Sequence, residues 1–131
     1  MVHCVIQRDM TLFFGKSILI FEESGFLEPK VRQQLANAGT RTIGPLDSFI
    51  DIQLALGLFR VDAVIIDLRL DDETIIEAAK LLEQFKIEYL FASINAGRVH
   101  PDQFVLSSDV NDLADIARAL FGAATHTVTI H

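Results

Sequence analysis

The sequence predicts an α/β domain built on a mostly parallel sheet, and two features carry the prediction. Short, continuous apolar runs alternate along the chain with segments in which apolar residues recur at helical spacing. Continuous apolar runs are typical of strands covered on both faces, as parallel strands usually are. The 131 residues are 50% hydrophobic and 22% charged, which suits one domain with one sizeable core.

Five strands and four helices follow from these patterns. The expected strands are 17–21, 41–44, 63–67, 89–93 and 104–106, and the expected helices are 26–38, 47–59, 72–86 and 109–121. Gly39 suits the end of the first helix, and Asp109 suits the N-cap of the last. Only "INAGRVHPDQ" separates the fourth strand from the fifth, and it has no helical stripe. A crossover usually needs a dozen or more residues, so we expect the fourth helix to be shortened or absent.

Charge and cysteine content exclude several classes of protein. The net charge of −7 argues against a nucleic-acid partner, because phosphate binding needs a basic face. The single cysteine, Cys4, excludes an internal disulfide and fits a reducing compartment. No uncharged run approaches the roughly 18 residues that cross a bilayer, and Arg8 and Asp9 interrupt any leader-like stretch. We therefore expect a cytoplasmic protein with no nucleic-acid or membrane partner.

Acidic residues follow the first and third expected strands. Glu22 and Glu23 come directly after one apolar run, and Asp67 ends another. In open parallel sheets, functional residues collect at the carboxyl ends of the strands, near the point where strand order reverses. If the first and third strands are neighbours, the three carboxylates meet in one pocket, where their repulsion favours a bound cation. Mg²⁺ suits such a site, because it takes oxygen ligands and keeps several waters.

In order and spacing, these residues resemble the receiver domains of response regulators in two-component systems. "FEES" matches the acidic pair of that family, "VIIDLRL" its phospho-accepting aspartate, and "FASI" its threonine or serine. The resemblance implies a flavodoxin-like, doubly wound sheet of five parallel strands in the order 2-1-3-4-5. It also implies phosphorylation of Asp67 and a Mg²⁺ ion, and it assigns the metal to Glu22, Glu23, Asp67 and the backbone carbonyl of Arg69. The Ser93 hydroxyl would hydrogen-bond the phosphoryl group.

The resemblance further implies a signalling module rather than an enzyme. Its partner would be a sensor histidine kinase or a phosphotransfer protein in a phosphorelay. We expect a receiver domain over 17–122, an N-terminal extension over 1–16 and a tail over 123–131, which is too short for an output domain. A homodimer would form through the side made by the fourth helix, fifth strand and fifth helix.

The sequence departs from the family at several positions. Where receivers have Lys-Pro, the chain reads "FVLSSDV", so that Ser107 takes the place of the lysine. A serine offers a hydrogen bond but no charge, which predicts slow phosphorylation. The departure leaves open an alternative, a degenerate receiver that acts as a phosphorylation-independent protein-interaction module. A nucleotide- or flavin-binding protein is disfavoured, because Glu22 and Glu23 would repel phosphate without a metal. An aspartyl phosphohydrolase would need an acid where Arg69 stands.

Overall fold

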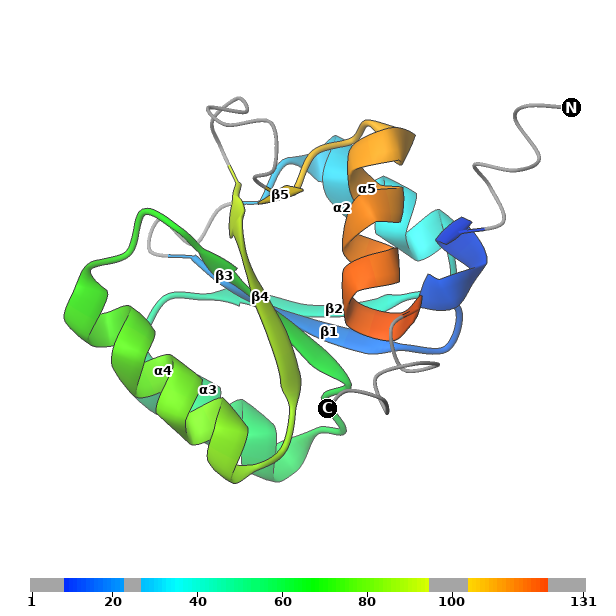
Figure 1. Cartoon of the computed structure of the whole chain (residues 1–131). Helices are drawn as coiled ribbons and strands as arrows, with labels where there is room; N and C mark the ends of the chain where they lie inside the picture. Colours follow the sequence, from blue (N-terminus) through cyan, green and yellow to red (C-terminus); the bar gives the residue numbers. More distant parts are fainter. Residues whose placement is uncertain (1–8, 23–26, 95–103, 123–131) are drawn as a thin grey trace, which may run out of the picture.

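The sheet is the framework of the molecule. The computed structural model describes residues 9–22, 27–94 and 104–122, and its five parallel strands lie in the order β2-β1-β3-β4-β5 (Figure 1). The strands are β1 (Ser17–Phe21), β2 (Arg41–Leu46), β3 (Ala63–Asp67), β4 (Glu88–Ser93) and β5 (Phe104–Val105). Every residue of β1 and β3 is buried, as their unbroken apolar runs predict for the central strands of a covered sheet. The expected order 2-1-3-4-5 is confirmed.

Helices cover both faces of the sheet. Figure 1 shows α2 (Pro29–Asn37) and α5 (Val110–Ala117) on one face, and α3 (Phe49–Leu58) and α4 (Asp72–Gln84) on the other. Each face of the sheet has its own apolar cluster. Alternate residues of each strand place their side chains in one cluster or the other. In β1, for example, Ile18 and Ile20 pack toward α2 and α5, whereas Leu19 and Phe21 pack toward α3 and α4. The flavodoxin-like, doubly wound arrangement is therefore confirmed.

The segment before β1 belongs to the same folded body. The short 3-10 helix η1 (Thr11–Phe13) places Phe13 in the core with no exposed surface. The Phe13 carbonyl accepts a hydrogen bond from the Thr40 hydroxyl at 3.0 Å, and the Phe13 ring packs edge-to-face on Phe121 at 6.2 Å. Part of the expected extension over 1–16 thus packs on the sheet, while its residues 1–8 lie outside the described residues. Phe13 stands between Leu12 and Phe14 in a short apolar run with no clear periodicity, so the sequence does not show which of these side chains is buried.

Several element ends differ from the expected ones. Strand β2 runs on to Leu46, two residues beyond 44, while β5 stops at Val105. Asp109 is the N-cap of α5, as expected, and accepts a hydrogen bond from the Asn111 N–H at 2.8 Å. The expected shortening of the fourth helix falls on 95–103, and the tail falls on 123–131, both outside the described residues. Within the described ranges, no helix combines the length and apolar character needed to cross a membrane.

Candidate functional site

Two acidic residues stand at the ends of neighbouring strands, at the carboxyl edge of the sheet. Strands β1 and β3 are hydrogen-bonded neighbours, and their register pairs Phe21 with Ile66. Glu22 follows β1 directly and Asp67 is the last residue of β3, so the two residues lie at strand ends that are one strand spacing apart, about 4.8 Å. Both residues are buried, with 0% and 2% of their surface exposed. The expected meeting of the first and third strand ends thus holds for Glu22 and Asp67, while Glu23 lies outside the described residues.

The loop after β3 closes over Asp67. The Leu68 N–H still donates to the Ala92 carbonyl of β4 at 2.9 Å, and the Leu70 N–H donates to the Asp67 carbonyl at 3.2 Å. The Arg69 N–H donates to Asp67 Oδ1 at 3.0 Å, which is the local turn that aspartate commonly forms with the residue two positions later. A tight turn therefore fixes the orientation of the carboxylate.

The Arg69 side chain adds a second set of contacts to the same carboxylate. Its Nε lies 3.4 Å from Asp67 Oδ1, and its Nη2 lies 3.5 Å from Asp67 Oδ2. The Asp67 side chain is 3% exposed and the Arg69 side chain 51% exposed, so the guanidinium lies on the solvent side of the acid. The resemblance to receiver domains assigns only the backbone carbonyl of Arg69 to the site, as a metal ligand. The signal for the ion pair was a basic residue two positions past the aspartate, within reach across a tight turn.

The two candidate serines differ in position and in contacts. Ser93 ends β4 and is buried, one residue beyond Ala92, which pairs with Asp67 in the sheet. The structure therefore brings Ser93 to the strand end next to Asp67. Ser107 instead lies at the start of α5, where its hydroxyl donates to Asp112 Oδ2 at 2.9 Å and accepts from the Asp109 N–H at 3.0 Å. These two bonds tie Ser107 to the first turn of the helix.

The described residues fit a magnesium ion in part. Glu22 and Asp67 supply two carboxylates from adjacent strand ends, and Mg²⁺ needs only one or two protein carboxylates besides water and substrate oxygens. The part of the chain that the structure describes contains no group of three acidic, histidine or cysteine side chains able to hold a metal. A third carboxylate would have to come from Glu23, as the resemblance assigns. The chemistry of the donor set is right for a hard cation.

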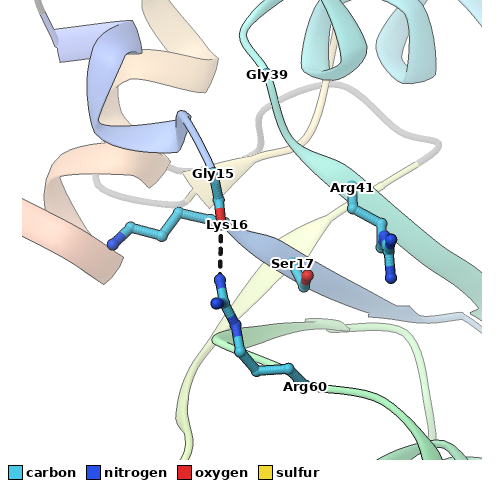
Figure 2. Close-up of a pocket in the computed structure, with 6 residues that line it drawn as sticks. All are labelled: Gly15, Lys16, Ser17, Gly39, Arg41 and Arg60. Carbon is cyan, nitrogen blue, oxygen red and sulfur yellow. Dashed lines mark hydrogen bonds between the residues drawn. The ribbon is translucent and has the colours of Figure 1, made fainter.

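A cavity of about 300 Å³ lies at the opposite edge of the sheet, where β1 and β2 begin (Figure 2). Three cations line it, but Figure 2 shows Lys16 and Arg41 pointing in different directions. Arg60 donates to the Gly15 carbonyl at 2.8 Å and pairs with Asp62 at 2.9 Å. The Lys16 ammonium lies 5.1 Å from the centre of the Phe121 ring. The cavity therefore does not gather its positive charges around one point, and the acidic strand ends remain the better site.

Comparison with known proteins supports the fold of the chain. The crystal structure of the response regulator PhyR from Brucella abortus matches with a TM-score of 0.58 and 19% sequence identity. The match covers 95% of this chain. The chain has a receiver-like fold. It spans 58% of the PhyR chain, so the likeness concerns part of that protein. No protein-family model matches the sequence, and no curated protein matches it either.

Proposed function

We propose that this receiver-like domain accepts a phosphoryl group on Asp67 in a phosphorelay. The observation that carries the proposal is the buried Asp67 carboxylate beside Glu22, at the ends of adjacent central strands of a receiver-like fold. A carboxylate oxygen of Asp67 would attack the donor phosphorus, forming a P–O bond while the bond to the leaving group breaks with its electron pair. The product is an aspartyl phosphate. Positioning and charge neutralisation account for most of the catalysis in such transfers.

The neighbours of Asp67 suit this reaction. The turn made by the Arg69 N–H holds one carboxylate oxygen, which limits the rotations that would misalign the nucleophile. Ser93, buried at the adjacent strand end, would donate a hydrogen bond to a phosphoryl oxygen. Glu22, Glu23, Asp67 and the Arg69 carbonyl would hold Mg²⁺. When bound, this ion offsets the negative charge of the phosphoryl oxygens.

The partner in this proposal is a sensor histidine kinase or a phosphotransfer protein in the cytoplasm. A phosphohistidine is a high-energy donor whose leaving nitrogen needs little assistance, which suits an acceptor site built from positioning and charge. The chain itself would act as the acceptor in a signalling pathway and would turn over no other substrate.

Intact-mass analysis of the full chain tests the proposal. The protein is incubated with acetyl phosphate, with and without Mg²⁺, beside Asp67→Asn as the matched variant. We expect one phosphate adduct on the wild type that depends on Mg²⁺ and is missing from Asp67→Asn. An adduct of equal yield on Asp67→Asn would refute the assignment.

A second candidate, a phosphorylation-independent interaction module, is favoured by the surface of α3. One face of this helix carries a row of aliphatic side chains spaced one turn apart. These are Ile50, Leu54 and Leu58, which are 66%, 58% and 74% exposed. A row of exposed aliphatic side chains is typical of a surface that meets another protein.

The oligomeric state tests whether the exposed face of α3 mediates self-association. Sedimentation equilibrium would be run on the wild type, Asp67→Asn and Leu54→Lys. A dimer that persists in Asp67→Asn and dissociates in Leu54→Lys would support association through α3 without phosphorylation. A monomer at every concentration would exclude self-association through this helix.

A further inference from the structure

Arg69 is the charged side chain that the structure brings onto Asp67. Three of its donors converge on the two carboxylate oxygens: the backbone N–H at 3.0 Å, Nε at 3.4 Å and Nη2 at 3.5 Å. The two side-chain distances are long for hydrogen bonds, and the guanidinium is half exposed. The side chain is therefore close enough to neutralise the acid and loosely enough held to move when a group is added to it.

The position that the resemblance assigns to a lysine cannot supply this charge. Ser107 is uncharged, and its hydroxyl already bonds Asp112 and the Asp109 N–H at the start of α5. Phosphoryl transfer spreads negative charge over three equatorial oxygens, which a nearby cation stabilises. Without a lysine, that cation must come from another residue or from the metal alone.

We propose that Arg69 supplies the protein's cation at the acceptor, pairing first with the Asp67 carboxylate and then with the phosphoryl oxygens. The inference rests on the proposed function. A guanidinium suits the task, because it is always charged and its planar fork binds phosphate oxygens in pairs. Its place on the solvent side of Asp67 puts it on the side from which a donor approaches. The side chain would shift outward by rotation about its own bonds as the phosphoryl group forms.

The test compares labelling rates of the full chain with acetyl phosphate and excess Mg²⁺. Substitution at position 69 keeps the backbone carbonyl that the resemblance assigns to the metal, so the variants report on the side chain alone. Removing one preorganised donor often slows a reaction by a hundredfold or more. Because this guanidinium is half exposed, we expect Arg69→Gln to label about tenfold more slowly and Arg69→Lys to fall between Arg69→Gln and the wild type.

The chain offers a matched control in Arg60. It too pairs with an aspartate two residues away, Asp62, but at the opposite edge of the sheet. Arg60→Gln removes the same charge and should label at the wild-type rate. A rescue variant, Arg69→Gln with Ser107→Lys, places a cation at the position that the resemblance assigns to a lysine and should recover most of the lost rate.

The outcomes separate this inference from the proposed function. Equal labelling of the wild type and Arg69→Gln would overturn the role of Arg69 and leave Asp67 as the acceptor. An equal loss in Arg60→Gln would also overturn it, because net charge alone would then explain the effect. A wild type that takes no label would overturn the proposed function and this inference together. Thermal unfolding of each variant would show whether the protein is folded at the labelling temperature, so that a slow rate is not caused by unfolding.

Discussion

Phe13→Ala tests whether the segment before β1 is part of the domain. The Phe13 ring has no exposed surface, and it packs against the cluster between the sheet, α2 and α5. Truncating a fully buried phenylalanine costs about 3–5 kcal/mol through lost burial and the cavity left behind. The edge-to-face contact with Phe121 places the expected cost near the middle of that range, about 4 kcal/mol.

The adjacent residue is a matched control. Phe14 has the same side chain and the same local sequence, but 76% of it is exposed. Phe14→Ala should therefore change the free energy of unfolding by no more than about 0.5 kcal/mol. For a chain of this length, 1 kcal/mol corresponds to about 4 °C in Tm, so Phe13→Ala should lower Tm by about 15 °C.

Urea and thermal unfolding followed by circular dichroism would measure both variants, since the chain has no tryptophan. If the two substitutions have equal and small effects, residues 9–16 are not packed on the core. The expected boundary at residue 17 would then stand.

Three further predictions concern a side-chain hydrogen bond, a helix face and the site. Glu83 accepts a hydrogen bond from the Tyr89 hydroxyl at 2.7 Å, and this bond raises the pKa of Tyr89 above 10.0. The bond therefore stabilises the fold below pH 10, and its contribution is lost as the pH rises through the folded pKa. Glu83→Gln should move the ultraviolet titration of this single tyrosine back toward 10.0, and an unchanged titration would contradict the assigned cause. In α3, Ile52→Ala should cost about 2–5 kcal/mol in urea unfolding, whereas Leu54→Ala should cost about 0.5 kcal/mol or less, because only Ile52 is buried. Similar costs would mean that α3 is rotated. Ser107→Lys should speed labelling by acetyl phosphate while losing about 1 kcal/mol of stability with its helix-start hydrogen bonds. No gain in rate would show that the missing charge does not limit the reaction.

The sheet was predictable because its central strands are continuous apolar runs. β1 and β3 have the expected ends, and their burial on both faces is what such runs require. Helix faces were harder to assign. In α3, apolar residues surround the helix, so spacing alone only weakly favours the buried face, which contains Ile52 and Ala55. Which face of α3 is buried depends on how the helix packs on the sheet, and the local sequence pattern does not determine this.

The site was predictable as far as strand ends determine it. Glu22, Asp67 and Ser93 lie where the ends of neighbouring parallel strands must bring them. The contacts of Arg69 depend on the turn after Asp67, and those of Ser107 depend on the start of α5. At both places several hydrogen-bond partners lie within reach of one side chain. Such choices are decided by distances of a few ångströms that residue spacing does not fix.

The residue that carries the phosphoryl group shows whether Asp67 is the acceptor. Borohydride converts an aspartyl phosphate to homoserine, a stable mark that survives digestion. Trypsin cleaves after Arg60, Arg69 and Lys80, which separates Asp67 from the other two acids of the loop, Asp71 and Asp72. We expect the mark in the peptide 61–69, at Asp67, after treatment of the wild type with acetyl phosphate and Mg²⁺. A mark in the peptide 70–80, or no mark in either peptide, would contradict this expectation.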